Sequence, residues 1–304
     1  QGDWSSDVCS SDLSAKTQVT RQDFRLFHRL RVRWAEVDMQ KIVFNGHYLT
    51  YLDTAVTAYW SRIALPYESS FHLLGGELYV KKATLEYHAS ALMDDDLSIG
   101  MKCSKMGKSS MVFEAGIFRG DKLLISGELI YVFADPKTQT SKPIPEALRN
   151  ILLIYEAGGS VVDLKIGGWD ELKEGAAALR TEVFVHEQEI PQELEWDEHD
   201  AKAVHAVIWN KLGQPVATGR LLQPQAQVAQ IGRMAVAKPL RGGNLGRKVI
   251  EAFIETARLR GDKEVILHAQ CSAEGFYRRL GFHAHGDIFQ DAGIDHIEMS
   301  LKLA

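Results

Sequence analysis

The order of the expected helices and strands changes past the middle of the chain, and this change limits the fold more than any other feature. Residues 46–63 have the spacing of an amphipathic helix, with Tyr48, Leu52, Ala55 and Tyr59 on one face. Four strand-like runs separated by short polar turns come next, at residues 77–88, 96–105, 109–119 and 122–133. Because such a meander needs the helix to cover its apolar face, the sequence predicts an α+β domain.

Helices and strands alternate in the second half, after a Gly-Gly-Ser stretch at residues 158–160. We expect helices at 169–186, 243–260 and 272–280, and strands at 203–210, 215–222, 231–236, 264–269 and 296–301. A length of 304 residues is too great for one typical domain. We therefore predict two unrelated domains, at residues 14–150 and 165–304, joined by a linker at residues 151–164.

The first 13 residues differ in character from the rest of the chain. Residues 3–13 read DWSSDVCSSDL, which resembles the conceptual translation of a common sequencing-library adapter. The alternative is a genuine disordered N-terminus, since this composition cannot bury a core. We interpret residues 1–13 as an adapter-derived artefact and base no functional argument on them.

Composition and charge exclude several classes of protein. Hydrophobic residues make up 45% and charged residues 25%, which is typical of a protein with packed cores. No apolar stretch approaches the roughly 20 residues of a membrane span, and three scattered cysteines form no metal motif. Residues 14–158 hold 18 Lys and Arg against 16 Asp and Glu, so no basic nucleic-acid-binding face is expected. We expect a cytoplasmic protein that binds no membrane, nucleic acid or metal, with His283 and His285 in a surface loop.

A carboxylate precedes the helix of the first half. The expected strand ends at Asp38, and the helix begins near Asn45. Amide groups at a helix start have no partner inside the helix, and the helix dipole is positive there. Such amides can polarise a carbonyl oxygen, while Asp38 acts as a nucleophile or as a general base for water. The alternative is that Asp38 only caps the turn.

The residues around Asp38 resemble the motif of the 4-hydroxybenzoyl-CoA thioesterase family of hotdog folds, in which a long helix is wrapped by an antiparallel sheet. The matching residues are Trp34, Glu36, Asp38, Ile42, Val43, Phe44 and Tyr48, and the similarity extends over about residues 24–135. The resemblance implies that Asp38 is the catalytic carboxylate, that the Asn45 main-chain amide polarises the thioester, and that this domain forms a homo-oligomer. Lys41 stands where the family usually has glycine, so it either crowds the loop or meets a CoA phosphate.

A glycine-rich turn joins a strand to an amphipathic helix in the second half. It includes Arg241, Gly242, Gly243 and Gly246. Small residues let the backbone approach an anion, and the helix start offers free amides. Taken alone, the segment is compatible with a pyrophosphate site or with a plain turn.

Three further segments, at residues 178–188, 273–282 and 291–299, together with this turn resemble the GNAT acetyltransferase superfamily and its ElaA-type branch. The resemblance covers about residues 165–303 and implies a mixed-sheet α/β domain that binds acetyl-CoA as co-substrate. The implied acetyl-CoA contacts are Met234, Ala235, Val236, Arg241, Gly242, Gly243, Asn244, Gly246 and Arg247. Asn244 replaces the first motif glycine, and asparagine tolerates a positive φ better than most residues.

The resemblance places Tyr277 where the superfamily often has the general acid. Its alternative is a packed core tyrosine. No general base is evident, and Glu195, His268 and His296 are candidates. Residues 187–200 hold seven acids and no Lys or Arg, which indicates a solvated face or an acceptor site that attracts a cationic amine.

Together these features predict a bifunctional CoA enzyme that hydrolyses acyl-CoA and transfers an acetyl group to an unidentified amine. One alternative is an acyl-CoA sensor in which only one domain, or neither, is active. Another is a dehydratase with a His/acid pair on the first helix, for which His47 and Asp53 are poorly placed because six residues separate them.

Overall fold

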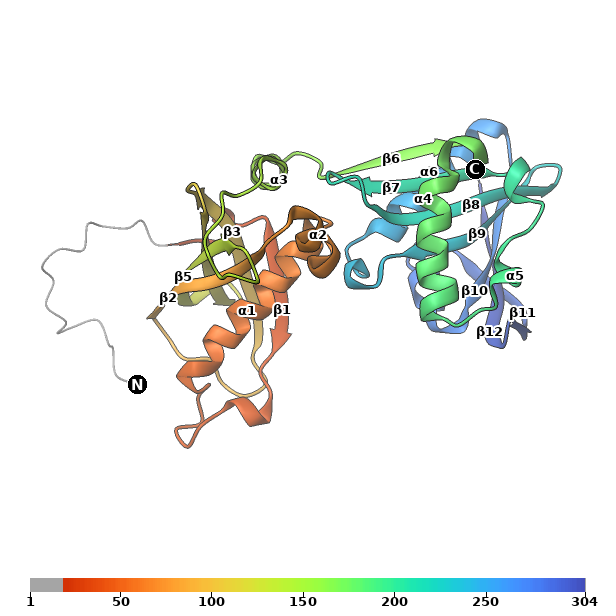
Figure 1. Ribbon diagram of the computed structural model, residues 1–304. Helices are drawn as coiled ribbons and strands as arrows, with labels where there is room; N and C mark the ends of the chain where they lie inside the picture. Colours follow the sequence, from red (N-terminus) through yellow and green to blue (C-terminus); the bar gives the residue numbers. More distant parts are fainter. Residues whose placement is uncertain (1–18, 304) are drawn as a thin grey trace, which may run out of the picture. The chain divides into compact units, whose positions relative to one another are not determined.

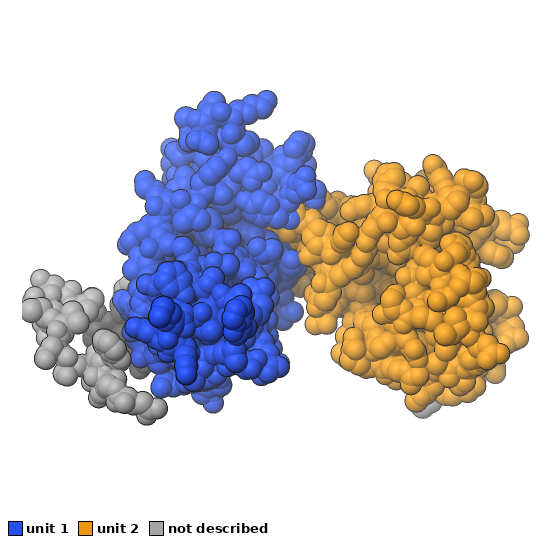
Figure 2. Space-filling view, turned by 90° about the horizontal axis from the view of Figure 1, so that it is seen from below, with its two compact units in different colours: residues 1–63, 67–159 blue, residues 64–66, 160–304 orange. Residues whose placement is uncertain are grey.

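The computed structural model describes residues 19–303, so the interpretation of residues 1–13 lies outside the described part of the chain. The described residues form two compact units, coloured separately in Figure 2. The first contains the residues up to Ile63 and Tyr67–Gly159, and the second contains Ala64–Pro66 and the residues from Ser160 onward. Each unit is considered by itself below.

The first unit is a five-stranded antiparallel sheet with a long helix on one face (Figure 1). The strand order is β1-β3-β4-β5-β2. The strands are β1 (Leu26–Arg31), β2 (Glu77–Tyr87), β3 (Asp96–Met106), β4 (Ser110–Arg119) and β5 (Lys122–Ala134). The helices are α1 (Asn45–Arg62), α2 (Tyr67–Leu74) and α3 (Glu146–Glu156). This is the predicted hotdog architecture.

Helix α1 buries one face against the sheet. Its buried residues are Tyr48, Tyr51, Leu52, Ala55, Val56, Tyr59 and Trp60. The Tyr59 ring meets Phe113 of β4 edge-on, with ring centroids 5.1 Å apart. Gly127 of β5 permits the close approach of the helix, because a Cβ atom there would lie 2.8 Å from Leu52 Cδ1. The helix is therefore fixed over the middle of the sheet, and its first turn lies near the loop that precedes it.

The second unit is a seven-stranded mixed sheet with the order β11-β12-β10-β9-β8-β7-β6. Only the β9/β10 pair is parallel. The strands are β6 (Val162–Gly167), β7 (Val204–Asn210), β8 (Pro215–Gln225), β9 (Val228–Val236), β10 (Glu264–Gln270), β11 (His283–Asp291) and β12 (Ile294–Lys302). The helices are α4 (Trp169–Arg180), α5 (Gln192–Glu195), α6 (Leu245–Arg260) and α7 (Glu274–Arg278).

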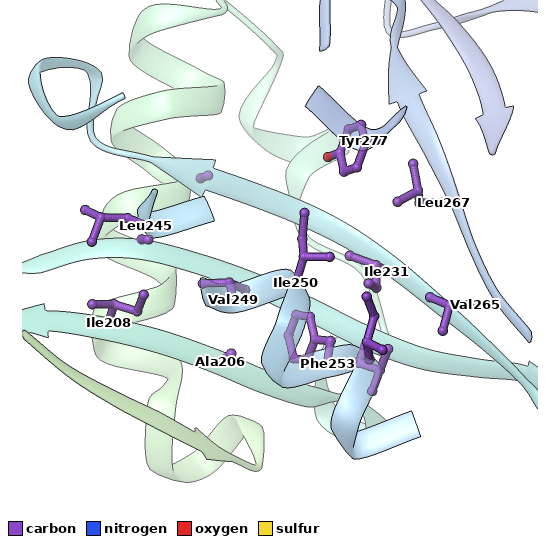
Figure 3. Close-up of a cluster of buried hydrophobic side chains, with 14 of the residues drawn as sticks. Ala206, Ile208, Ile231, Leu245, Val249, Ile250, Phe253, Val265, Leu267 and Tyr277 are labelled. Atoms are coloured by element: carbon purple, nitrogen blue, oxygen red, sulfur yellow. The ribbon is translucent and has the colours of Figure 1, made fainter. Parts of the chain in front are cut away.

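Helices α4 and α6 cover opposite faces of this sheet. Val207 of β7 clusters with Leu172 and Ala176 of α4. The neighbouring Ala206 and Ile208 belong instead to the cluster that contains Val249 and Phe253 of α6 (Figure 3). Since successive side chains of a strand point to opposite faces, the two helices must lie on different sides. This is the predicted GNAT arrangement.

Several local expectations differ from the structure. The segment expected as a linker, residues 151–164, contains the end of α3 and the start of β6, and the irregular part runs only from 157 to 161. The helix expected to reach His186 changes at Thr181 into a π-helix, Thr181–Glu187. His283 and His285 lie on strand β11 and not in a loop, and His285 Nε2 is 2.7 Å from Ser300 Oγ. Within residues 19–303, no helix is long and apolar enough to cross a membrane.

Candidate active sites in the two units

A tight turn holds Asp38 in the first unit. The Asp38 amide donates to the Ile42 carbonyl, and the Lys41 amide donates back to the Asp38 carbonyl, both at 2.9 Å. Lys41 has a φ of 62°, in the left-handed region that favours glycine. The turn therefore forms with lysine in place of glycine, and the exposed Lys41 side chain does not crowd it.

The start of α1 faces the same groove as Asp38. The groove has a volume of about 760 Å³, and Asp38, Asn45, Tyr48 and Tyr87 are among its lining residues. Among the described residues, the amides of Asn45 and Gly46 have no hydrogen-bond acceptor. Asp38 Oδ1 accepts a hydrogen bond from the Gln40 amide at 2.8 Å, whereas no described group donates to Oδ2. Asp38 and Asn45, whose amide is free at the start of the helix, thus line one groove, an arrangement that can polarise a carbonyl group beside a carboxylate.

Glu36 anchors the loop that carries Asp38, a role that the sequence analysis missed. Its carboxylate accepts hydrogen bonds from the Arg33 amide and the Tyr51 hydroxyl, each at 2.8 Å, and its carbonyl accepts one from the Phe44 amide. Burial alone would raise the pKa of Glu36, but the hydrogen bonds from Arg33 and Tyr51 outweigh it and lower that pKa. Glu36 therefore ties both ends of the loop that carries Asp38 to helix α1.

We predict that Tyr51→Phe lowers the free energy of unfolding of the first unit by about 2 kcal/mol, because it removes a buried hydrogen bond to a carboxylate. The lowered Glu36 pKa means that this stabilisation is present above the ordinary pKa of glutamate and is lost as the pH falls through the folded-state pKa. Urea unfolding at neutral and acidic pH measures both effects. Tyr131→Phe is the matched control, since its hydroxyl lies 3.5 Å from Asp53 Oδ1. Equal losses for the two variants would contradict the anchoring role.

His47 and Asp53, the pair considered for a dehydratase, have different surroundings in the structure. Asp53 lines two shallow cavities with Tyr131 and Val80. The His47 ring instead contacts Phe44, with centroids 6.0 Å apart. The Asp38 groove therefore remains the candidate site of the first unit.

Strands β9 and β10 separate in the second unit. Their parallel pairing ends at Ile231 and Leu267, although β9 continues to Val236. Arg233 has a φ of 51°, and the register of β9 against β8 shifts beside it, so the strand bulges there. Residues Met234, Ala235 and Val236 therefore run beyond the point where β10 leaves β9. This open edge can pair with an extended ligand such as the amide-containing pantetheine arm of CoA.

The glycine-rich turn forms a cradle at the start of α6. Gly242 and Asn244 have φ values of 82° and 66°. The sequence-based expectation that Asn244 can replace glycine in a left-handed position is thus met. Among the described residues, no acceptor pairs with the amides of Gly242, Asn244, Leu245, Gly246 or Arg247. These five donors at the start of a 16-residue helix suit a pyrophosphate.

Both arginines of this turn form ion pairs with glutamate side chains. The Arg241 guanidinium donates to both carboxylate oxygens of Glu187, at 2.7 and 2.6 Å. Arg247 Nε donates to Glu251 at 2.6 Å along helix α6. The hydrogen bonds from Arg241 lower the pKa of Glu187 and keep it ionised. A phosphate group that recruits the Arg241 side chain must therefore displace Glu187.

A cleft of about 450 Å³ lies beside the separated strands. Its lining includes Met234 and Tyr277, with the three base candidates Glu195, His268 and His296. Burial raises the pKa of Tyr277 to about 12, so its hydroxyl stays protonated at neutral pH. Tyr277 also packs at the border of the hydrophobic cluster in Figure 3. It is thus both a core residue and a residue of the cleft.

The acidic run at residues 187–200 has a second part, residues 195–200, that forms neither a solvated face nor an unpaired acidic site. Glu195, Asp197 and Asp200 alternate with Arg180, Arg220 and Arg233 in a closed ring of ion pairs. The shortest separations include Arg220 to Asp197 at 2.6 Å and Arg180 to Asp200 at 2.8 Å. These three acids are compensated, so they supply no net attraction for a cationic amine. The sequence analysis missed this ring, which ties residues 195–200 to α4, β8 and the β9 bulge.

Within residues 19–303, no group of three or more His, Cys, Asp or Glu side chains is arranged to hold a metal ion.

Comparisons with known proteins identify both units. A family model of the GNAT acetyltransferase domain matches residues 170–303, and a model of the thioesterase superfamily matches residues 40–126. A UPF0039 protein of Schizosaccharomyces pombe is 38% identical over 127 residues, which are 41% of this chain and 84% of that protein. The chain belongs to the GNAT acetyltransferase family. Its first unit is a domain of the thioesterase superfamily.

One further relative and one solved structure match parts of the chain. Protein ElaA of Escherichia coli is 33% identical over 129 residues, which cover 41% of this chain and 84% of ElaA. The solved structure of a 1,4-dihydroxy-2-naphthoyl-CoA thioesterase from Synechocystis is 16% identical, with a TM-score of 0.39, and the match covers 42% of this chain and 94% of that one. Both domain families use CoA thioesters.

Proposed function

We propose that the protein is a bifunctional CoA-dependent enzyme. The first unit hydrolyses acyl-CoA thioesters, and the second transfers an acetyl group from acetyl-CoA to an amine. The observation that carries this proposal is the groove in which Asp38 lies with the unpaired amides at the start of α1. No described residue donates a hydrogen bond to Asp38 Oδ2, so this oxygen is available for proton transfer or attack.

In the proposed hydrolysis, the thioester carbonyl oxygen accepts a hydrogen bond from the Asn45 amide. The carbonyl carbon then becomes more electrophilic, and the positive end of the helix dipole stabilises the developing negative charge. Asp38 either removes a proton from the attacking water or attacks the carbonyl carbon directly. The C–S bond breaks, and the products are a carboxylate and free CoA.

In the proposed acetyl transfer, the pyrophosphate of acetyl-CoA lies at the start of α6 against the cradle of residues 241–247. The pantetheine arm pairs with the open edge of Met234, Ala235 and Val236. Tyr277 then acts as the general acid, because a protonated hydroxyl in the cleft can donate to the leaving thiolate.

The proposal includes two domains that work independently, with the division near residues 157–161 where regular structure stops. It also includes a homo-oligomer formed by the first unit. Strand β2 supports this, since it lies at an edge of its sheet, and an edge strand can pair with a strand of a second copy. The proposed location is the cytoplasm, where acyl-CoA and acetyl-CoA are available.

The deciding experiment measures free thiol released by the intact protein from short, long and aromatic acyl-CoAs, first without and then with a panel of primary amines. We expect amine-independent release from some acyl-CoAs and amine-dependent release from acetyl-CoA. Tight acyl-CoA binding without thiol release under either condition would favour the alternative, an acyl-CoA sensor.

A further inference from the structure

Acetyl transfer to an amine needs a base as well as an acid, since the attacking nitrogen must lose a proton. Four side chains that can accept a proton, Glu195, His268, Asp291 and His296, line the same cleft as Tyr277. Their surroundings differ enough to show which of them is placed to act as the base. Asp291 is exposed at the end of β11, so nothing fixes its carboxylate within the cleft.

Glu195 is occupied by its role in the ion-pair ring. It is 2% exposed, Arg180 Nε donates to its Oε1, and Arg233 Nε lies 3.4 Å from its Oε2. Each oxygen therefore faces a guanidinium. Burial raises the pKa of Glu195 despite the two arginines, but both of its oxygens are occupied by guanidinium groups, so neither is directed at an incoming amine.

His268 is exposed and directs its Nε2 toward a carboxylate. The distance from Nε2 to Glu298 Oε2 is 3.6 Å, and the two residues are register partners on β10 and β12. The Nε2 atom of His268 is therefore directed at Glu298, and its exposed ring is not fixed within the cleft.

His296 has one ring nitrogen held by a backbone carbonyl and the other free of any described hydrogen bond. Its Nδ1 lies 2.8 Å from the Ile294 carbonyl oxygen. A carbonyl oxygen can only accept a hydrogen bond, so Nδ1 carries the hydrogen, and Nε2 of the neutral ring has a free lone pair.

The surroundings of His296 keep this lone pair available. The ring stacks on Phe289, with centroids 6.0 Å apart and an angle of 27°, which fixes its orientation. No described residue forms a hydrogen bond with Nε2. This atom is nevertheless not among the side-chain nitrogens that are both buried from solvent and without a hydrogen-bond partner. Because His296 is only 9% exposed and lines the cleft, its Nε2 opens onto that cleft.

The position of His296 suits the reaction. Its register partner on β10 is Gln270, three residues past Leu267, where β9 and β10 stop pairing. An acetyl group carried along Met234 to Val236 would enter the cleft between these diverging strands. Tyr277 reaches the same cleft from α7.

We propose that His296 is the general base of acetyl transfer, an inference that rests on the acetyltransferase function proposed above. The amine nitrogen forms a bond to the acetyl carbonyl carbon and gives its proton to His296 Nε2. The C–S bond breaks, and the CoA thiolate takes a proton from the Tyr277 hydroxyl. Exchange with solvent returns a proton to Tyr277 and removes one from His296, so the net products are an N-acetyl amine and CoA.

Other charged groups line the cleft around His296. Asp291 comes from β11, and His268 with its partner Glu298 comes from β10 and β12. Glu195, Arg220 and Arg233 belong to the neutral ring on the opposite side. These groups contribute to any pH dependence, so the test needs a readout specific to His296.

The test compares the intact protein with His296→Asn, in which the asparagine amide can still donate to the Ile294 carbonyl. The probes are acetyl-CoA and a panel of primary amines that includes an amino acid amide, a polyamine, an aromatic amine and a short peptide. We expect kcat/KM for the best amine to fall by about 10²- to 10⁴-fold, with unchanged affinity for CoA. His283→Asn, at an exposed position on β11 away from the cleft, is the matched control.

Nitrogen-15 NMR of the histidine rings in the intact protein gives a second readout, for which we expect the Nδ1–H form at His296. Transfer that His296→Asn retains within about threefold, or an Nε2–H form at His296, would overturn the proposed base. Absence of transfer by the wild-type protein to every amine would instead overturn the acetyltransferase function itself, and the role of His296 with it.

Discussion

Replacing Asp38 by asparagine should reduce thiol release from acyl-CoA by about 10²- to 10⁴-fold, the usual contribution of a positioned proton-transfer group. Asparagine has the same shape and can still accept the hydrogen bond from the Gln40 amide. It cannot accept a proton from water or attack a thioester. The loss should therefore lie in kcat, with little change in the binding of acyl-CoA or in the free energy of unfolding.

Two observations would separate this effect from a general disturbance of the loop. Asp121→Asn changes an exposed carboxylate of the same unit, 3.7 Å from Arg21, and should leave hydrolysis unchanged. Acetyl transfer by the second unit should also be unaffected in Asp38→Asn. Hydrolysis at the wild-type rate in Asp38→Asn would show that the catalytic site does not lie in this groove.

The main elements of both units could be predicted from the sequence because their patterns are strong. Helix α1 was expected at residues 46–63 and runs from Asn45 to Arg62, since its apolar residues recur at helical spacing. Strands β2 to β5 were expected within two residues of their observed ends, because polar turns separate them. The strand expected to end at Asp38 is β1, which ends at Arg31, because Trp34–Glu36 forms a 3-10 helix.

The missed elements have weak or misleading local signals. Residues 146–156 form α3 and bury Leu148, Ile151, Leu152 and Tyr155 at helical spacing. Pro145 stands just before the first turn, where proline starts a helix, but the linker prediction was based on the Gly-Gly-Ser stretch at residues 158–160 that follows this helix. Strands β6 and β11 are edge strands whose residues are mostly exposed, so no alternation of apolar and polar residues marks them.

The candidate sites also include features that the sequence could predict and features that it could not. Asp38 and Asn45 are seven residues apart, and the local motif could indicate that they act together. Arg180, Arg220 and Arg233 lie on separate elements, and only the sheet topology brings them to the acids of residues 195–200. The ion-pair ring could not be predicted, because it depends on strand order and on the β9 bulge rather than on sequence spacing.

Asn244→Val should weaken the binding of CoA by about 5- to 30-fold and lower the rate of acetyl transfer from subsaturating acetyl-CoA equally. Asn244 has a φ of 66°, where a β-branched side chain is strongly disfavoured, at a cost of about 1–2 kcal/mol. The glycine-rich turn must then either retain a strained backbone at residue 244 or lose the left-handed conformation that aligns its five free amides. Calorimetric titration with CoA measures the loss.

Asn244→Gly is the matched control, since glycine adopts this conformation without strain and should bind CoA at least as well as the wild type. Thioester hydrolysis by the first unit should be unchanged in Asn244→Val, and likewise in variants of Arg241 or Gly246, because the two sites lie in separate units. If Asn244→Val binds CoA like Asn244→Gly, the pyrophosphate does not rest on this cradle. If Asn244→Val also loses hydrolysis, the two activities are coupled, and the independence of the domains must be abandoned.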